Sequence, residues 1–202
     1  MTITGTGFAP ETVGNTVAFN RTRARVTAAS RTSLTVLVPD AVTAGPVSVR
    51  TAGGLATTVA DYLVPPPGVP AETLVDGGRV TVGGAGVTTA VPGGRTAVLR
   101  FSGTAGQKLS LAFSGNTVGT AKVALHTPYG QTFAAGQYDK PRPLNGNQSF
   151  ALPPLPTAGT YSIAVDPDGT AAGSLTVTLS TQVTGELSTT GAGTPMPLDR
   201  VG

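Results

Sequence analysis

Apolar and polar residues alternate along most of the chain, in short runs that end at Gly, Pro, Asn or Asp. Successive side chains of a strand point to opposite faces, so such alternation over about four to eight residues predicts strands with one buried face. Almost no run has the period of an amphipathic helix. The pattern therefore predicts an all-β fold.

The runs fall into two groups. The first group comprises Thr2–Thr4, Thr16–Phe19, Ala24–Ala28, Ser33–Val38, Gly45–Thr51 and Ala56–Val64. The second comprises Arg79–Val82, Ala97–Ser102, Lys108–Ser114, Ala121–His126, Gln131–Gln137, Gln148–Leu152, Gly159–Val165 and Ser174–Ser180. Strands at this density, about eight in 110 residues, fit a β-sandwich, so we expect two β-sandwiches in tandem.

Three consecutive prolines, at positions 65–67, separate the two groups. Such a run cannot pair in a central strand and favours a stiff, extended linker. We predict a first domain over residues 1–64, a linker over 65–71 and a second domain over 72–181. The segment GELSTTGAG at 185–193 echoes GRVTVGGAG at 78–86, so residues 182–202 are expected to begin a further repeat.

Charge, cysteine content and hydropathy exclude several kinds of partner and site. Only 11% of the residues are charged, and 13 Lys and Arg against 10 Asp and Glu give a net charge of +3. This small excess predicts no nucleic-acid partner. The chain has no cysteine, which excludes disulfides and thiolate metal sites. No apolar run reaches the ~18 residues of a membrane-spanning helix, so no membrane span is expected.

Six motifs of the first group occur in a characteristic order. They are TITGTGF (Thr2–Phe8), NTVAFN (Asn15–Asn20), ARV (Ala24–Val26), SLTVLVP (Ser33–Pro39), GPVSVRTAGG (Gly45–Gly54) and DYLV (Asp61–Val64). With them the first domain resembles an IPT/TIG domain, which is an immunoglobulin-like sandwich. That family usually has an earlier strand before the first motif, so the resemblance implies an N-terminally truncated domain with an unpaired sheet edge.

Three longer motifs belong to the second group. They are FSGTAGQKLSLAFSG (Phe101–Gly115), VALHTPYGQTFAAG (Val123–Gly136) and PTAGTYSIAVDPDGTAAGSLTVTLS (Pro156–Ser180). The second domain resembles bacterial pre-peptidase C-terminal domains, which implies a jelly-roll-like sandwich. Domains of this kind are accessory modules of secreted proteins, acting as spacers, adhesion units or carbohydrate and substrate binders. Some relatives bind calcium through clustered acidic residues.

The sequence predicts no enzyme. His126 is the only histidine, and a Ser-His-Asp triad would need it. No G-x-S-x-G elbow or other nucleophile motif accompanies it. A structural or solvent-facing role for His126 is the favoured interpretation.

Aromatic and polar side chains gather between His126 and Gln148, although aromatic residues make up only 5% of the chain. In sugar-binding sites, exposed aromatic rings stack on the sugar rings, and amide side chains form hydrogen bonds with the sugar hydroxyls. The alternative is that Phe133 and at least one tyrosine fill the core. The candidate ligand-binding residues are His126, Tyr129, Tyr138, Arg142, Asn145 and Asn147.

Asp166 and Asp168 lie in a DPDG turn. Two carboxylates this close are candidates for a calcium site, because calcium prefers oxygen ligands. The alternative is ordinary turn chemistry, in which an Asp side chain accepts hydrogen bonds from nearby backbone N–H groups. Apart from this calcium candidate, no cofactor is expected.

Arg21, Arg23 and Arg25 alternate along one predicted strand, which puts Arg23 and Arg25 on one face. Eukaryotic relatives of the IPT/TIG fold contact DNA. Nucleic-acid binding would need a wider basic surface and stacking aromatic rings. The favoured interpretation is a solvated face that also protects an edge strand.

These expectations combine into one interpretation. The chain is expected to be a non-catalytic spacer and interaction module of a larger secreted or cell-surface bacterial protein, with neighbouring domains of that protein as its partners. The alternative is a carbohydrate-binding module, formed by the second domain and attached to an extracellular enzyme or adhesin. Its partner would be a polysaccharide or another cell-surface ligand.

Overall fold

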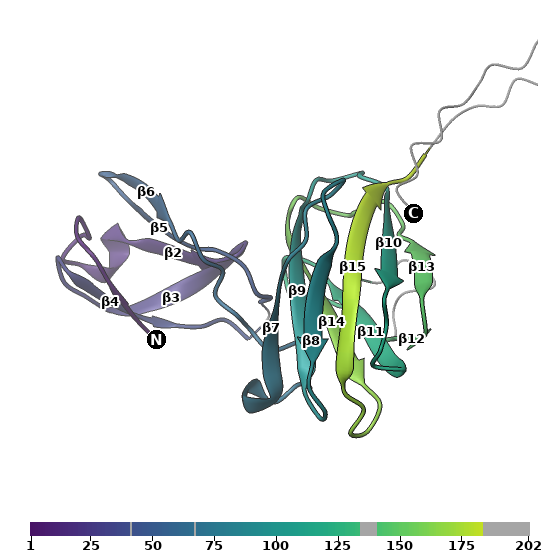
Figure 1. Ribbon diagram of the computed structural model, residues 1–202. Helices are drawn as coiled ribbons and strands as arrows, with labels where there is room; N and C mark the ends of the chain where they lie inside the picture. The colour runs from purple at the N-terminus through teal and green to yellow at the C-terminus, as the bar shows by residue number, and fades with distance from the viewer. Residues whose placement is uncertain (41, 67, 134–140, 184–202) are drawn as a thin grey trace, which may run out of the picture.

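The computed structural model describes residues 1–40, 42–66, 68–133 and 141–183 of the 202 residues. Strands dominate these residues, and their two helices, η1 (Thr12–Gly14) and η2 (Ala71–Thr73), are single 3₁₀ turns. The predicted all-β class is confirmed. Below, domain one and domain two denote residues 1–64 and 72–181; these limits stay predictions. The two bodies lie side by side, with β7 on the side of domain two that faces domain one (Figure 1).

Domain one is built from one six-stranded sheet that bends into two layers. Its order is β1-β4-β3-β2-β5-β6. The first residues of β3 pair with β2, as at Val17–Ala24, and its later residues pair with β4, as at Arg25–Leu37. A bulge between Val26 and Ala28 increases the local twist. The strands are β1 (Thr2–Thr4), β2 (Thr16–Phe19), β3 (Thr22–Ala29), β4 (Ser33–Leu37), β5 (Val47–Thr51) and β6 (Gly54–Thr57).

The core of domain one follows from the alternation of its strands. Val17 and Phe19 of β2 are buried, whereas Thr16 and Ala18, which alternate with them, are only partly buried. Phe19 packs edge-on against Tyr62, with ring centroids 5.3 Å apart. The buried cluster comprises Val17, Phe19, Ala24, Leu34, Val36, Val42, Val47 and Val49.

Domain two is a two-layer sandwich. A four-stranded sheet, β13-β10-β15-β8, packs against a five-stranded sheet, β12-β11-β14-β9-β7. All pairs are antiparallel except β7 with β9. The strands are β7 (Leu74–Arg79), β8 (Val87–Val91), β9 (Thr96–Gly103), β10 (Leu109–Ser114), β11 (Thr120–His126), β12 (Arg142–Asn145), β13 (Gln148–Ala151), β14 (Gly159–Pro167) and β15 (Gly173–Thr181).

Tyr161 occupies the centre of the domain two core. Its ring stacks on Phe101 at 5.2 Å and meets Phe133 edge-on at 6.1 Å. Its hydroxyl donates a hydrogen bond to the backbone carbonyl of Thr157 at 2.7 Å. Burial raises the pKa of Tyr161, and the bond to Thr157 offsets part of that rise. The tyrosine thereby ties the turn before β14 to the core.

Several strand limits differ from the sequence prediction. β8 and β12 were not predicted, because a proline lies next to each or within it. Pro143 is tolerated in β12 because β12 is an edge strand, whose outward N–H positions need no partner. The predicted strand at 56–64 ends at Thr57, and only a bridge between Gly45 and Tyr62 follows.

Two further predictions concern segments that are only partly described. In the predicted strand at 131–137, only 131–133 are described, and they form a single bridge between His126 and Thr132. Of the predicted further repeat at 182–202, only Gln182 and Val183 are described, and the rest lies outside the described residues.

The proline-containing linker does not stand free of the sheets. Pro66 is buried, and its carbonyl accepts a hydrogen bond from the Val69 N–H at 3.0 Å. Leu63 and Leu74, on either side of the linker, pack with buried residues on the outer face of the five-stranded sheet. That cluster joins Ala44 of domain one to Val98, Ala124 and Ala164 of domain two. The linker therefore lies along domain two.

Candidate functional site

The candidate site lies on the outer face of the five-stranded sheet, which faces away from the core of domain two. Along β11, Val123 and Leu125 point into the core. Lys122, Ala124 and His126 alternate with them and therefore point outward. Their direct partners on β14 are Asp166, Ala164 and Ser162. The register thus places charged or polar side chains at both ends of this face and alanines between them.

The linker turns this face into a groove. A hollow of about 240 Å³ lies between linker residues and the sheet. We call it the outer-face groove. It is lined by Pro66, Gly68, Val69, Thr96, Lys122, Ala124, His126, Thr132, Pro141, Ala164 and Asp166. Apolar walls with a few polar groups are typical of small-molecule sites.

His126 closes one end of the outer-face groove. His126 is only 4% exposed, and neither of its ring nitrogens has a hydrogen-bond partner among the described residues. Burial lowers its pKa from 6.5 to about 4. The neutral ring at pH 7 therefore offers one N–H donor and one acceptor nitrogen. Ser162, directly opposite on β14, is also buried, and its hydroxyl has no partner within the described part of the chain.

Asp166 lies at the other end of the groove. Its carboxylate accepts a hydrogen bond from the Thr96 hydroxyl at 3.2 Å. Lys122, opposite Asp166, forms an ion pair with Asp168 at 3.8 Å. Lys122 and His126 are four residues apart on β11, a separation of roughly 13 Å. His126 and Asp166 therefore cannot bind one cation together, but an elongated ligand can contact both.

The calcium candidate gains no further ligands from the fold. In the described residues, no three His, Cys, Asp or Glu side chains gather in a way that could hold a metal ion. Asp166 and Asp168 instead interact with Thr96 and Lys122. A calcium site at Asp166 and Asp168 stays a prediction.

The other predicted ligand residues are dispersed. Tyr129 is 39% exposed in the turn after β11. The Arg142 guanidinium lies 5.0 Å from the centre of the Phe150 ring. Asn145 pairs with Thr120, at the opposite end of β11 from His126 and so roughly 20 Å away. The Asn147 carboxamide oxygen accepts the Asn116 N–H at 3.1 Å.

Tyr138 lies outside the described residues. The structure brings His126 together with Asp166, which the sequence assigned to a different site, and it separates His126 from Asn145 and Asn147. The ligand roles of these residues stay predictions. Sequence reasoning missed Lys122, Thr96 and Thr132. The alternation in Lys122-Val-Ala-Leu-His126 puts lysine and histidine on one face, but only the strand register adds the other two.

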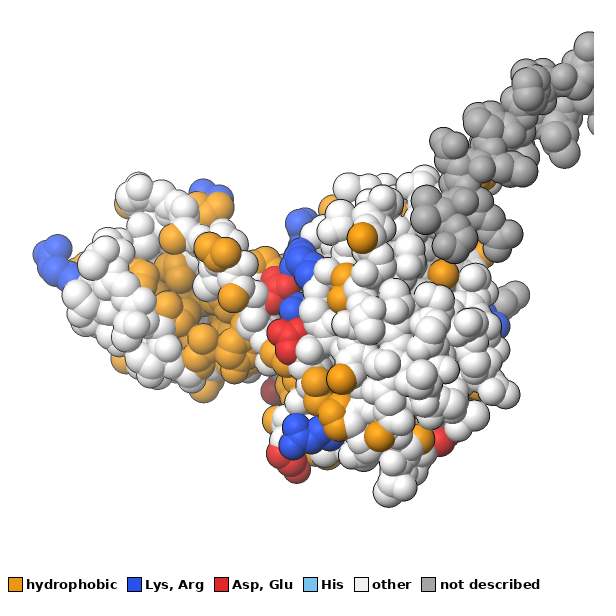
Figure 2. All heavy atoms as spheres, viewed as in Figure 1, with side chains coloured by type: hydrophobic (Ala, Val, Ile, Leu, Met, Phe, Trp, Pro, Cys, Tyr) orange, Lys and Arg blue, Asp and Glu red, His pale blue; other side chains and the backbone are white. Residues whose placement is uncertain are grey.

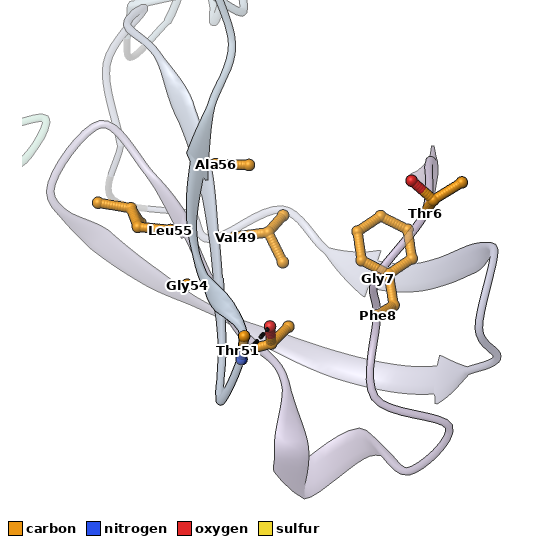
Figure 3. A pocket seen from close by; sticks show the side chains of 9 residues that line it. Thr6, Gly7, Phe8, Val49, Thr51, Gly54, Leu55 and Ala56 are labelled. Atoms are coloured by element: carbon orange, nitrogen blue, oxygen red, sulfur yellow. Dashed lines mark hydrogen bonds between the residues drawn. The ribbon is translucent and has the colours of Figure 1, made fainter.

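A second hollow, of about 290 Å³, lies in domain one between the β5–β6 hairpin and the loop after β1 (Figure 3). Val49 and Ala56 point toward Phe8 across it, whereas Leu55 points to the other side of the hairpin. Hydrophobic side chains surround this part of domain one in the space-filling view (Figure 2). No charged or titratable side chain lines the hollow, so it offers no chemistry for catalysis or metal binding.

No protein-family model matches the sequence, and no curated protein matches it. The IPT/TIG resemblance of domain one therefore stays a prediction. Both helices of the described residues are single turns, far too short to cross a membrane.

Solved structures similar to the chain include the pre-peptidase C-terminal domain of a collagenase from Bacillus anthracis. It is 16% identical, with 52% of this chain and 96% of that chain covered and a TM-score of 0.36. PliG of Aeromonas hydrophila, a periplasmic inhibitor of g-type lysozyme, is 20% identical, with 52% and 99% covered and a TM-score of 0.33. The secreted serine protease VesC of Vibrio cholerae is 11% identical, with 90% and 43% covered and a TM-score of 0.37. These likenesses assign no ligand and no activity to this chain.

The pKa of His126 makes stability depend on pH. Between pH 6.5 and about 4 the unfolded chain binds a proton at His126 that the folded chain does not, so stability is lost as the pH falls through this window. His126→Gln removes this proton uptake. We expect the difference in unfolding free energy between the wild type and His126→Gln to shift by up to about 3 kcal/mol from pH 7 to pH 4.

Urea unfolding at a series of pH values measures this shift, and NMR titration of the single imidazole gives its pKa directly. Parallel stability curves for the two proteins, with an imidazole pKa near 6.5, would show that His126 is not enclosed as described.

Proposed function

We propose that the chain is a non-catalytic spacer and interaction module of a larger secreted or cell-surface bacterial protein. The observation that carries the proposal is a buried charged junction that holds domain one against domain two. A spacer transmits position only if its units keep their relative orientation, and domains joined by weak contacts move by default. The contacts below supply the needed rigidity.

Asp61 of domain one is the centre of the junction. Its carboxylate forms ion pairs with Arg79 and with Arg100, the latter at 3.1 Å from Nε. The side chains of Asp61 and Arg100 are 7% and 8% exposed. Arg100 is close enough to Asp61 to form an ion pair, but its Nε–H does not have the geometry of a hydrogen bond. Removing one member of a buried pair leaves an uncompensated charge and costs about 3–5 kcal/mol.

Asp76 of domain two completes the charge pattern. It meets Arg100 Nη1 at 2.8 Å, and the Gly78 N–H donates to the same carboxylate at 2.8 Å. Partial burial alone would raise the pKa of Asp76. Arg100 and the Gly78 N–H lower it by more than burial raises it, so the pKa lies below its usual value. Arg100 thus lies between one carboxylate from each domain. Acidic and basic side chains meet between the two bodies in the space-filling view (Figure 2).

Uncharged contacts extend the junction. The Asn20 amide donates to the Thr160 carbonyl at 2.8 Å, and the Thr43 hydroxyl donates to the Thr127 carbonyl at 3.1 Å. Gly159 has a φ of +145°, and a Cβ there would lie 2.7 Å from the Pro128 ring and 2.9 Å from the Arg21 side chain. The backbone conformation and the packing of Pro128 within domain two thus need glycine at this position, which Arg21 of domain one also approaches.

A triad-type hydrolase receives no support from the geometry. Neither His126 nitrogen contacts a carboxylate or a serine hydroxyl among the described residues. Without such a partner the imidazole is not oriented as a general base.

Carbohydrate binding at the outer-face groove is a second candidate, and the polar groups at its Lys122–Asp166 end favour it. Both ring nitrogens of His126 are enclosed, so this residue forms the closed end of the groove. The Asp166 carboxylate accepts hydroxyl hydrogen bonds, and the Lys122 ammonium donates them. Pro66 and Val69 offer apolar contact to the ring faces of a sugar.

Residual dipolar couplings test the spacer proposal. We expect the amides of domain one and domain two to fit a single alignment tensor in the wild-type chain. Asp61→Asn removes the charge that holds Arg79 and Arg100, so the two domains should then need separate tensors. Asp168→Asn, which disrupts only the exposed pair with Lys122, is the control and should keep one tensor. Separate tensors in the wild type would refute a rigid spacer.

Binding to a panel of soluble oligosaccharides tests the second candidate. Any glycan that binds the wild type should bind Lys122→Ala and Asp166→Ala at least about tenfold more weakly, because each variant loses a polar group that lines the groove. Lys108→Ala, on an exposed position away from the groove, is the matched control. No binding across the panel, or equal loss in the control, would reject the groove as a sugar site.

A further inference from the structure

The outer face of domain one carries an arginine cluster that the strand register assembles. β5 and β2 pair with Arg50 opposite Thr16, and β3 and β4 pair with Arg25 opposite Leu37. Val17 pairs with Ala24 and Ala18 with Arg23, so Arg25 lies on β3 just beyond the last residue that pairs with β2. Leu55, Arg50 and Thr16 form one row across β6, β5 and β2, and Arg25 and Leu37 continue the outer face on β3 and β4.

Arg23 joins this row from the next position on the same face. It pairs with Ala18, and its Nη2 donates to the Thr16 hydroxyl at 3.4 Å. Arg23 and Arg25 are two residues apart on β3, so their backbones lie roughly 7 Å apart. The Arg23 guanidinium thus contacts Thr16, Arg50 is paired with Thr16 from the other side, and Arg25 follows Arg23 on the same face of β3. We call Arg23, Arg25 and Arg50 the arginine face.

The arginine face has no acidic partner in the described part of the chain. None of the ion pairs found among the described residues includes Arg23, Arg25 or Arg50. Like charges on neighbouring strands disfavour the sheet unless a counter-charge is present. A bound anion would supply that counter-charge.

Edge protection does not explain these arginines. The sequence suggested a solvated face that also protects an edge strand. Arg23 and Arg25 are exposed, but β3 is not an edge of the six-stranded sheet, so the edge-strand part of this interpretation is wrong. The edges are β1 and β6, and β6 carries no charged residue. Arg23, Arg25 and Arg50 therefore lie on interior strands of the sheet.

Exposed leucines flank the arginine face. Leu37 and Leu55 are 55% and 56% exposed. Leu55 points away from the hollow that Val49 and Ala56 line, and so toward the side of Arg50 (Figure 3). No aromatic residue lies in this row, so stacking on nucleic-acid bases has no support. Aliphatic side chains beside guanidinium groups fit the apolar faces and anionic substituents of a charged sugar polymer.

From this arrangement we propose that the arginine face binds an anionic polysaccharide. Guanidinium groups form paired, charge-assisted hydrogen bonds with planar or tetrahedral oxyanions such as carboxylate and sulfate. The roughly 7 Å spacing of Arg23 and Arg25, with Arg50 two strands away on β5, lets one extended chain contact all three arginines with successive substituents. The surface is separate from the junction and from the outer-face groove, so it adds a contact that neither function proposed above requires.

Heparin, a sulfated polysaccharide, is the probe for the test. The variant Arg23→Gln/Arg25→Gln/Arg50→Gln should bind at least about tenfold more weakly than the wild type at 0.1 M NaCl. The slope of log K against log[NaCl] should fall in magnitude by about 2, because three charge contacts are lost. Thermal unfolding of the variant, monitored by circular dichroism, verifies that it is folded; substitutions at such exposed positions cost little stability.

A matched control removes three exposed charges elsewhere, as Arg31→Gln/Arg95→Gln/Lys108→Gln. It has the same net charge as the test variant and should keep wild-type affinity to within about threefold. Equal loss in the two variants would overturn the proposal in favour of a net-charge effect, and unchanged binding in the test variant would overturn it outright.

Two further probes fix the ligand class. Dextran sulfate should bind and neutral dextran of the same length should not, and binding of neutral dextran would contradict a charge-based site. Duplex DNA that binds as tightly as heparin at equal salt would overturn the assignment to a polysaccharide. The dipolar-coupling experiment on the junction is independent, so failure here leaves the spacer proposal standing.

Discussion

The arrangement of the two domains depends on one buried carboxylate. Asp61 leaves the end of domain one and lies between Arg79 and Arg100 of domain two, and Asp76 meets Arg100 from its other side. Burying Arg100 without these partners would cost several kcal/mol, so its position requires both domains to be in place. Because Arg79 and Arg100 come from paired strands, β7 and β9, the junction rests on a sheet and not on a loop.

The junction also determines what the outer face of domain two can do. Val98, Ala124 and Ala164 would be exposed on an isolated sandwich, but Ala44, Leu63 and Leu74 pack with them. The linker then runs over the same face and encloses His126 beside Pro66 and Val69. The low pKa of His126 therefore follows from its burial on this face, and the outer-face groove from the linker that covers it. Small alanines at the centre of the face permit the close approach.

Local pattern could be predicted from the sequence, whereas partners across strands could not. Alternation located β2, β4, β10, β11 and β15 well, because buried residues repeat every second position there. It missed β8 and β12, where nearby prolines suggested irregular chain. The residues of the candidate site were predicted less accurately than the strands. Nearness in sequence grouped His126 with Asn145, which lies at the far end of β11. Register, which no single segment encodes, brought Asp166 to the His126 groove and Arg50 to Thr16, which Arg23 also contacts.

A double-mutant cycle on Asp61 and Arg100 tests most directly whether the buried ion pair holds the two domains together. Unfolding free energies would be measured for the wild type, Asp61→Asn, Arg100→Met and the double variant. If the pair is buried and shared between the domains, the coupling energy should be at least about 2 kcal/mol, because the double variant no longer contains an unpaired charge at this contact. A coupling energy near zero would show that the two side chains are solvated independently, and the account of a fixed junction would be wrong.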